Sequence, residues 1–360
     1  MRSFVHTQPS TRVVFGTGAF DRLADEVRRV GARRALVVST PGRRELAGEA
    51  GRSLGTLLAG LFTEAMMHVP IENARAAREA AARVDADCAV AIGGGSAIGV
   101  AKAIALERTL PIVAVPTTYS GSEMTPIYGL TEGGVKRSGR DVRVRPGTVL
   151  YDPALTVSLP PRVSGSSGMN AIAHAVEALY AADATPISSL LAAEAIHALA
   201  RSLPVVVKAP ANLDGRADAL YGAWLAGSAL AIASMSLHHK LCHALAGAFN
   251  LPHAELHAVV LPHATAFNAE AAPEAMRTIA DALHVPEAAQ GLYDLAVAIG
   301  APLSLEEIGM PEDGLDFAAQ LAVRNPYDNP RPIDQDGVRA LLDDAYYGRR
   351  PAAAAALRAR

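Results

Sequence analysis

The sequence has few of the features that mark secreted, disulfide-rich proteins. Only two of its 360 residues are cysteine, and Cys88 and Cys242 lie in separate runs that predict a buried strand and a helix. This excludes a disulfide framework and fits reduced thiols in a cytoplasmic protein. The opening MRSFVHTQPSTRVVF contains no apolar signal-peptide core, so we expect no secretion.

An excess of charge of one sign is also missing. The formal net charge is −3 and only 19% of the residues are charged, which argues against a nucleic-acid partner and against a polybasic membrane surface. The uncharged residues 221–237 are about as long as a membrane-spanning helix. Their alanine, glycine and serine make them only mildly hydrophobic, so a core helix explains them better than a membrane span. Small molecules and other protein subunits are the expected partners.

Half of the residues are hydrophobic, which suffices for a large core in about two domains. Up to about residue 150, apolar runs such as RALVVST and LPIVAVPTT alternate with helical stretches, which predicts a parallel sheet covered on both faces. Beyond about residue 160 the sequence is alanine-rich and helical, and 151–165 marks the boundary. We therefore expect a Rossmann-like α/β domain over 1–157 and an all-α domain over 158–360.

Two glycine-rich turns compete as a phosphate-binding site. GTGAF at 16–20 lacks the third glycine of the dinucleotide fingerprint, because Asp21 occupies its place. GGGSAIGVAK at 93–102 follows an apolar strand, and its glycines let a pyrophosphate approach the free N–H groups of the next helix. A tight strand-to-helix turn is the alternative interpretation. The candidate phosphate contacts are Gly94, Gly95 and Ser96.

The segment PTTYSGSEMT at 116–125 follows the next strand. It should lie at the same carboxyl edge of the sheet, where open α/β folds bind ligands. Its hydroxyl groups are of the kind that contact a dinucleotide, although a polar loop with local caps is an equally good explanation. The candidate residues are Thr117, Thr118, Ser120 and Ser122.

Two segments carry imidazoles at helical spacing. Asn170 and His174 lie four residues apart in GMNAIAHAVEALY, so they share a helix face. His239 and His243 have the same spacing in HKLCH, and His253 follows. HKLCH lacks the glutamate of a zinc protease, and Asn170 is neutral where a carboxylate would bind a cation better. From the residues alone, a bound Zn²⁺ and a set of structural histidines both remain open.

From about residue 12 to NPRP near its end, the chain resembles the iron-containing alcohol dehydrogenases. The resemblance rests on GGGS after a strand, PTT…GSE, G-M-x-A-x-A-H-x-x-E-A and H-x-x-x-H. Within that family it is most similar to the maleylacetate reductases, through PTTYSGSEMTPIYGLTE, SGMNAIAHAVEALY and NPYDNPRP. The resemblance implies the two-domain architecture shared with dehydroquinate synthase, an active site in the cleft between the domains, and a homodimer.

The activity that this resemblance implies is reduction of the C=C bond of maleylacetate, or of chlorinated maleylacetates, by NADH or NADPH. The product is 3-oxoadipate, formed during the breakdown of aromatic compounds. Metal-dependent members of the family carry Asp, His, His and His where this chain has Asn170, His174, His239 and His253. Because an amide bears no charge, and because maleylacetate reductases are understood to work without metal, we expect no metal. A metal-dependent alcohol or aldehyde dehydrogenase and an inactive nucleotide-binding protein are the competing hypotheses.

The resemblance also implies residue roles. His243 aligns with the family histidine near the nicotinamide and is the expected proton donor or enolate partner. The other expected pocket residues are His174, His239 and His253, with Asn170, Arg137 and Lys240 for the dicarboxylate and Lys136 for the cofactor. The PTT loop is one residue shorter than is usual and carries Tyr119, so we expect different walls around the nicotinamide. Gly99 stands where the family often has Asp.

The residues that follow the strand RALVVST bear on the choice between NADH and NADPH. An acid that binds the adenosine ribose would normally stand just past this strand, but Arg43 and Arg44 follow there instead. We therefore expect NADPH to be accepted alongside NADH.

Overall fold

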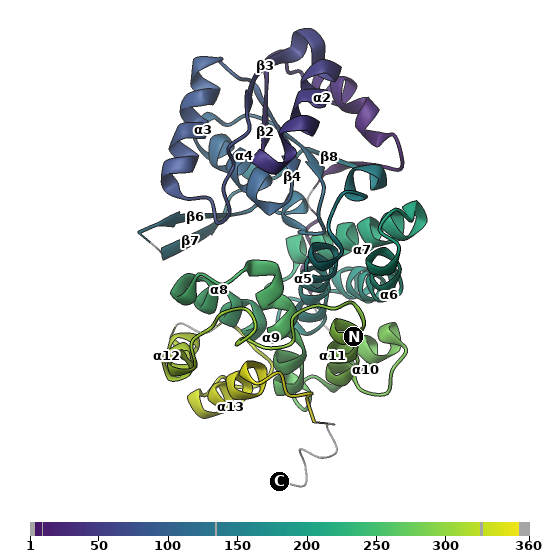
Figure 1. Cartoon of the computed structure of the whole chain (residues 1–360), viewed down its shortest axis with the longest axis vertical. Helices are drawn as coiled ribbons and strands as arrows, with labels where there is room; N and C mark the ends of the chain where they lie inside the picture. Colours follow the sequence, from purple (N-terminus) through teal and green to yellow (C-terminus); the bar gives the residue numbers. More distant parts are fainter. Residues whose placement is uncertain (1–3, 9, 134, 325–326, 353–360) are drawn as a thin grey trace. The chain divides into compact units, whose positions relative to one another are not determined.

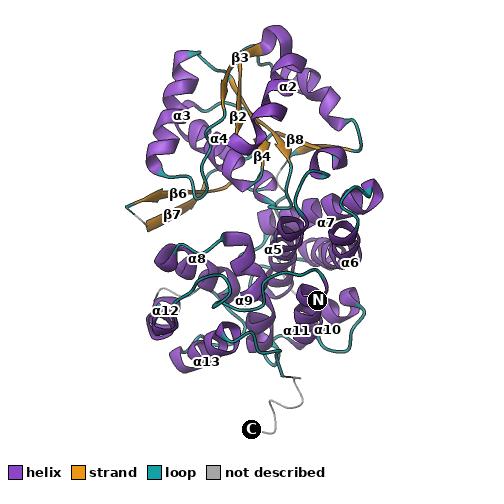
Figure 2. Cartoon of the chain, viewed as in Figure 1, coloured by secondary structure: helices purple, strands orange, loops and turns teal. Residues whose placement is uncertain are grey.

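The computed structural model describes residues 4–8, 10–133, 135–324 and 327–352, without the side chains of residues 135 and 136. The chain divides into two compact units, one formed by Gln8–Leu159 and the other by Pro160–Arg360 with Met1–Thr7. The first unit is α/β and the second is helical throughout its described residues (Figures 1 and 2). The expected fold class, an α/β domain followed by an all-α domain, is confirmed.

The sheet of the α/β unit is parallel, in the order β1-β8-β5-β4-β2-β3. Its strands are β1 Arg12–Phe15, β2 Ala35–Ser39, β3 Leu58–Phe62, β4 Cys88–Gly93, β5 Ile112–Pro116 and β8 Thr148–Tyr151. The strands β2, β4 and β5 are buried along their whole length, as their continuous apolar sequences predict for a doubly covered sheet. The strands β6 Ile127–Glu132 and β7 Val135–Arg140 form a separate antiparallel pair.

Helices cover both faces of this sheet (Figure 2). They are α1 Leu23–Arg29, α2 Arg44–Leu54, α3 Ile71–Arg83 and α4 Gly95–Arg108. Alternate residues of β2 point to opposite faces, as strand geometry requires. Leu36 and Val38 join the core beneath α3 and α4, whereas Ala35 and Val37 join the core beneath α1 and α2. The carboxyl ends of β4 and β5 are thereby held side by side on a rigid base.

The helical unit is built around α5, which is buried over most of its length and packs against α6, α7 and α9. Its helices are α5 Pro161–Tyr180, α6 Pro186–Lys208, α7 Leu213–Ile232, α8 Leu237–Phe249, α9 His253–Asn268, α10 Pro273–Leu283, α11 Ala288–Ala298, α12 Leu315–Val323 and α13 Gln335–Tyr346. Proline opens α5, α6 and α10, where its missing N–H has no helical partner to lose. Pro204 lies inside α6 and does not end it.

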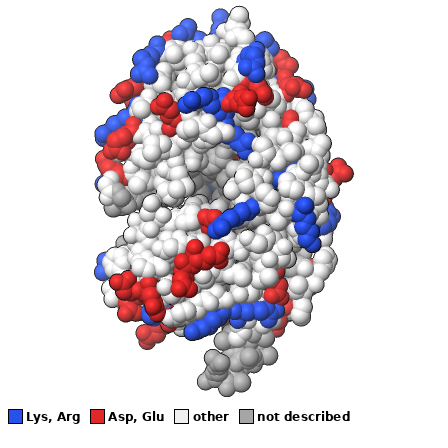
Figure 3. All heavy atoms as spheres, in the orientation of Figure 1, with Lys and Arg blue, Asp and Glu red and all other residues white. Residues whose placement is uncertain are grey.

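The stretch 221–237, which the sequence predicts as one core helix, is divided. Helix α7 ends at Ile232, α8 begins at Leu237, and the chain bends by 96° between them. By length and apolar composition α6 alone, or α7 and α8 as a broken pair, would suffice to cross a membrane. Core helices of soluble proteins meet the same criterion, and α6 packs against α5 and α7. On the face drawn in Figure 3, basic and acidic side chains are interspersed.

Candidate functional site

The glycine turn of the α/β unit joins β4 to α4. Gly93 has a φ of 143°, and Gly94 caps α4 in an extended conformation without a side-chain cap among the described residues. A Cβ atom at Gly94 would lie 2.8 Å from Thr118 Oγ1, so only glycine fits beside the 116–125 segment. Thr117 N also donates to Gly93 O at 3.0 Å. The glycine turn and the polar segment therefore touch at one edge of the sheet, and the first turn of α4 presents N–H groups that suit an anion.

The predicted cofactor residues differ in how exposed they are. Gly95 is exposed, and Gly94, Ser96, Thr118, Ser120 and Ser122 are partly buried, as befits residues that meet a ligand. The side chains of Thr117 and Tyr119 are almost completely buried. Tyr119 therefore packs inside the unit, and a nicotinamide wall formed by its ring would require that ring to move.

Two further predicted residues lie on β7. Lys136 pairs with Thr131 of β6 through the backbone, but its side chain lies outside the described residues. Arg137 is exposed and its Nη2 lies 3.8 Å from Glu132 Oε2. Gly99 has a local reason to be glycine, since a Cβ atom there would lie 2.7 Å from Val69 Cγ2.

The structure gathers the predicted histidines of the helical unit into one cluster. Asn170 and His174 lie on α5, His239 and His243 on α8, and His253 opens α9. The rings of His174 and His239 are stacked with centroids 5.1 Å apart. His243 lies 6.2 Å from His239 and 6.4 Å from His253 between ring centroids. Residues separated by up to 83 positions in the sequence thus form one imidazole-lined site.

Glu177 is a member of this cluster that the sequence reasoning did not assign. It is fully buried on α5, one helical turn beyond His174. Its carboxylate accepts hydrogen bonds from Ser236 N and His238 N, each at 2.8 Å, and lies 2.7 Å from His239 Nδ1. This contact holds the His239 ring with Nδ1 toward the carboxylate and Nε2 away from it. The H-x-x-E spacing after His174 was the available signal.

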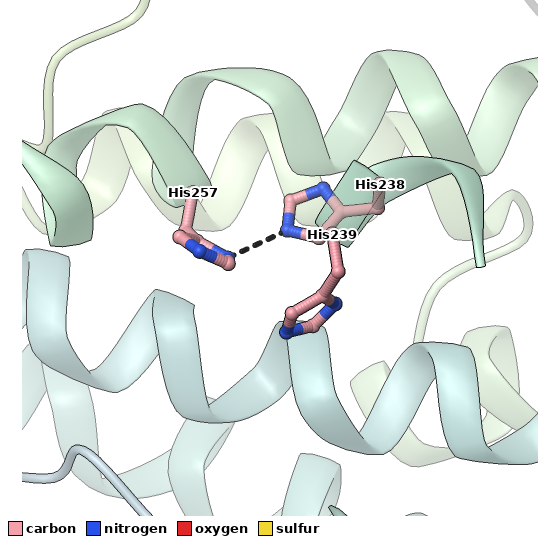
Figure 4. Close-up of side chains that lie close together, drawn as sticks. All are labelled: His238, His239 and His257. Atoms are coloured by element: carbon pink, nitrogen blue, oxygen red, sulfur yellow. Dashed lines mark hydrogen bonds between the residues drawn. The ribbon is translucent and has the colours of Figure 1, made fainter. Parts of the chain in front are cut away.

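Two more histidines join the cluster unpredicted. His238 Nε2 lies 2.8 Å from His257 Nδ1, and both rings are buried. The ligand atoms of His238, His239 and His257 all lie within 4.8 Å of one another, a grouping that can hold a metal ion (Figure 4). His257 lies one turn after His253 on α9, so its position follows from the helix once α9 is known to begin there.

Burial sets the protonation of this cluster. Loss of water, reinforced by neighbouring imidazoles, holds the pKa values of His174, His238 and His257 well below the ordinary histidine value. Burial also raises the pKa of Glu177 to about 7, against the opposing effect of its N–H donors. These three imidazoles are therefore neutral near pH 7, the form in which histidine binds metal.

Lys240 lies on α8, and Tyr327 lies beside it. The Lys240 ammonium is 5.6 Å from the centroid of the Tyr327 ring, and the Tyr327 hydroxyl lies 3.3 Å from His243 Nδ1. Lys240 is only partly buried. A cation and a hydroxyl group therefore accompany His243, the predicted proton donor.

Family models match most of the chain. The model described as "Iron-containing alcohol dehydrogenase" matches residues 10–153, and "Fe-containing alcohol dehydrogenase family, C-terminal" matches residues 164–346. The chain belongs to the iron-containing alcohol dehydrogenase family. The resemblance read from its motifs is confirmed.

Individual members of the family are similar over nearly the whole chain. Maleylacetate reductase of Burkholderia cepacia is 56% identical over 98% of this chain and 100% of its own length. Maleylacetate reductase of Sphingobium indicum is 54% identical over 97% and 99%. The crystal structure of maleylacetate reductase from Agrobacterium tumefaciens has a TM-score of 0.94 at 48% identity, covering 98% of this chain and all of that one.

Family membership contradicts the expectation that no metal is bound. A family named for iron points to an iron cofactor, so that expectation is wrong. The missing charge at Asn170 concerns one ligand only, and α8 and α9 bring two further imidazoles, His238 and His257, to the same place. A set of neutral nitrogen donors can replace part of what the carboxylate supplies.

The described residues fit such an ion. Asn170 Oδ1, His174 Nδ1 and His257 Nε2 are buried and have no hydrogen-bond partner among the described residues. Buried polar atoms are normally satisfied, and those that are not call for a partner such as an ion or water. Imidazole nitrogen suits iron and zinc, and Glu177 behind His239 is the carboxylate that commonly orients a metal-bound histidine.

Proposed function

We propose that this chain is a maleylacetate reductase, which transfers a hydride from NADH or NADPH to the C=C bond of maleylacetate and forms 3-oxoadipate. The observation that carries the proposal is 56% identity to a protein of that name over 98% of this chain. Chlorinated maleylacetates are included as substrates, since a halogen on the alkene leaves the conjugated ketone in place. The reaction belongs to the breakdown of aromatic compounds.

The chemistry requires an acid and a stabiliser of negative charge. Hydride leaves the nicotinamide and adds to the alkene carbon farther from the ketone, so NAD(P)⁺ forms and the electron pair of the C=C bond moves toward the ketone. The resulting enolate is stabilised by hydrogen-bond donors aimed at its oxygen. A proton then adds to the carbon next to the ketone, and the saturated keto acid is complete.

His243 is the residue that we propose for this proton or for a hydrogen bond to the enolate oxygen. It is only partly buried, unlike His174 and His239, so it can reach a substrate. The Tyr327 hydroxyl 3.3 Å from its Nδ1 orients the ring and can exchange a proton with it. The remaining pocket residues in this proposal are His174, His239 and His253.

The substrate is a dianion and needs cationic or hydrogen-bonding partners. We assign this role to Lys240, which lies beside His243 on α8, and to the amide of Asn170. Arg137 is a further candidate, and its exposed guanidinium forms a long ion pair with Glu132. The dinucleotide contacts in the proposal are Gly94, Gly95, Ser96, Thr117, Thr118, Tyr119, Ser122 and Lys136.

Asn170, His174, His239 and His253 would hold the iron that the family implies, with His257 close to His253 and His239. When bound, a divalent metal supplies Lewis-acid polarisation of the ketone oxygen. Glu177 keeps the His239 ring oriented whether or not an ion is present, because its other two hydrogen bonds fix the carboxylate to the start of α8.

We further propose a homodimer located in the cytoplasm. Both cysteines are buried and reduced, which fits a reducing compartment. Closed two-fold dimers are the commonest assemblies of soluble enzymes. Sedimentation of the purified protein tests the dimer.

The decisive experiment follows the fate of the hydride. NADH carrying deuterium at the transferable position is oxidised with maleylacetate, and the product is analysed by mass and NMR spectroscopy. We expect deuterium at the former alkene carbon of 3-oxoadipate and an intact ketone. Simple aldehydes serve as the comparison, and we expect them to oxidise NADH far more slowly.

Two results would contradict the proposal in different ways. Turnover of aldehydes alone, with deuterium on a carbinol carbon, would identify an alcohol or aldehyde dehydrogenase. No change in NADH fluorescence on titration with the protein would indicate that no cofactor is bound at all. Activity measured after chelation and after readdition of Fe²⁺ shows how far the reaction depends on the metal.

A further inference from the structure

A lysine is buried inside the α/β unit, where lysine is rarely found. Lys102 lies on α4, two turns after the glycine turn, and its side chain is completely inaccessible to solvent. A side chain in this position cannot touch a cofactor or a substrate. Its role must therefore lie in the residues that its side chain contacts.

Lys102 Nζ contacts four oxygen atoms of a single segment. It donates to Ser122 O at 2.7 Å and to Ile127 O at 2.6 Å. It also lies 3.2 Å from Ser122 Oγ and 3.1 Å from Thr125 Oγ1. An ammonium group has three N–H donors and no acceptor, so these oxygens compete for all of its hydrogen-bonding capacity. The ammonium thus bridges the two ends of residues 122–127.

The same segment is also held from its other side. Glu123 is fully buried, and its carboxylate accepts a hydrogen bond from the Tyr151 hydroxyl of β8 at 2.9 Å. Ser120 Oγ lies 3.3 Å from the other carboxylate oxygen. A buried cation from α4 and a buried anion of the segment therefore fix one stretch of chain between α4 and β8.

Residues 122–127 follow directly after residues 117–121, the polar loop that touches the glycine turn. Thr118 is the residue that a Cβ atom at Gly94 would strike, and it precedes Ser122 by four positions. Small displacements at 122–127 would thus be transmitted to Thr118, because only three residues intervene and Tyr119 among them is fully buried. The glycine turn and the polar loop share α4 as a common base.

We propose that Lys102 is a positioning residue for the dinucleotide, anchoring the 117–127 segment to α4 so that the glycine turn and the polar loop keep one geometry. The inference rests on the proposed cofactor role of these two segments. Its energetic basis is preorganisation, since a loop that is already ordered loses less entropy when the ligand binds. Burial lowers the pKa of Lys102 to about 7, so the anchor is maintained against a desolvation penalty.

The test compares NADH affinity with loop order in matched variants. Lys102→Met keeps the length of the side chain but removes all of its N–H donors. Thr125→Val removes one acceptor of Lys102 together with the local bonds of Thr125 Oγ1 to Ser122 O and Ile127 N. Lys208→Met is the control, because Lys208 ends α6 in the other unit. NADH binding is followed by fluorescence titration, and amide hydrogen exchange is measured over 117–127.

We expect Lys102→Met to weaken NADH binding about tenfold, with kcat at saturating cofactor changed by less than about threefold. Thr125→Val should weaken it about twofold to threefold, and the double variant should lose less affinity than the sum of the two single losses because both changes remove the Lys102–Thr125 contact. Amide exchange should become faster over 117–127 and stay unchanged over α1 and α2. Lys208→Met should behave as the wild type.

The outcomes separate this inference from the proposed function. If the wild type does not bind NADH, the proposed function fails and the inference falls with it. If the wild type binds NADH and Lys102→Met binds equally well, only the inference is overturned. Equal losses of kcat and affinity, or faster exchange throughout the unit, would indicate a general structural role and also overturn it. Should Lys102→Met fail to fold, Thr125→Val decides by the same measurements.

Discussion

Each unit buries a charged side chain beneath a segment that carries candidate site residues. In the α/β unit the charge is the cation of Lys102, which donates to carbonyl and hydroxyl oxygens of the 122–127 segment. In the helical unit it is the anion of Glu177, which accepts from the N–H groups that open α8 and contacts His239 directly. Lys102 contacts backbone and hydroxyl oxygens of one segment, including Ser122 Oγ, whereas Glu177 contacts both a backbone segment and a candidate metal ligand, His239.

This difference bears on how each site tolerates change. A loop held through four acceptors can adjust when one of them is lost, because three contacts to Lys102 remain. A helix start and an imidazole held by one carboxylate lose their common partner together. We therefore expect substitutions at Lys102 to affect ligand affinity first and substitutions at Glu177 to affect stability and ligand affinity together.

The largest expected effect is the pH dependence that Lys102 confers on stability. Its pKa falls from 10.5 in the unfolded chain to about 7 in the folded one, so between these values the unfolded chain binds more protons. The free energy of unfolding should therefore rise with pH from about 7 to 10.5, by up to about 4 kcal/mol. Lys102→Met should lack this rise, and urea unfolding of both proteins at pH 7 and pH 10 measures the difference. Parallel pH profiles would contradict the lowered pKa of Lys102.

Removal of Glu177 should come next in size. Glu177→Ala leaves two buried N–H groups and His239 Nδ1 without their acceptor, and we expect a loss of about 3 kcal/mol in the free energy of unfolding. The fluorescence of Trp224, the single tryptophan, reports on the helical unit during urea unfolding. Glu306→Ala removes an exposed carboxylate from the same unit and serves as the control. A similar loss in both variants would refute the anchoring role of Glu177.

The metal affinity of the helical unit offers a smaller effect. Asn170→Asp adds a charge to the buried donor set, and we expect Fe²⁺ or Zn²⁺ to bind about tenfold to a hundredfold more tightly. Competition with a chelating dye measures this. Asn250→Asp introduces the same charge at an exposed position and should change the affinity little. Unchanged affinity in Asn170→Asp would place the ion away from α5.

The smallest expected effect concerns cofactor choice in the α/β unit. Arg43 is already engaged by Ser158 Oγ at 2.6 Å, whereas Arg44 is exposed and contacts Thr63 Oγ1 at 3.2 Å. Arg44→Ala should raise the KM for NADPH about fivefold to tenfold, roughly 1 to 1.4 kcal/mol, because a phosphate contact is lost. The KM for NADH should change little, and Arg43→Ala should have the smaller influence on NADPH. A preference of the wild type for NADH above about a hundredfold would argue against any phosphate contact here.

The sequence predicted the parts of the fold in which local pattern and environment agree. The strand β4 was predicted because a parallel strand covered on both faces is a continuous apolar run. The glycines and the helix α4 follow it directly in the sequence. The pair β6 and β7 was not predicted, since GVKRSGR has no apolar alternation and the two strands form a pair apart from the six-stranded sheet. The split of 221–237 also escaped prediction. The break at Ser236 is held by Glu177, which lies 59 residues earlier.

The candidate site shows the same limit. Spacing alone placed Asn170 with His174 and His239 with His243, because residues four apart share a helix face. The packing of these two helices against α9 depends on tertiary structure, which the spacing does not show. His257 could therefore be assigned to the cluster only from the position of α9. The mistaken expectation of no metal arose in this way. It rested on the uncharged Asn170 and on the resemblance to maleylacetate reductases, and it did not count His238 and His257, whose closeness to His239 depends on the fold.

Each unit contains one buried cysteine, and the rate at which its thiol is alkylated reports on how that unit opens. Cys88 is sealed in β4, where burial raises its pKa to about 12, and Cys242 is sealed in α8. Neither thiol can meet an alkylating reagent until its own surroundings open. The two alkylation rates, resolved by peptide mass spectrometry, would therefore show whether the two units unfold together or one after the other. No label has to be introduced.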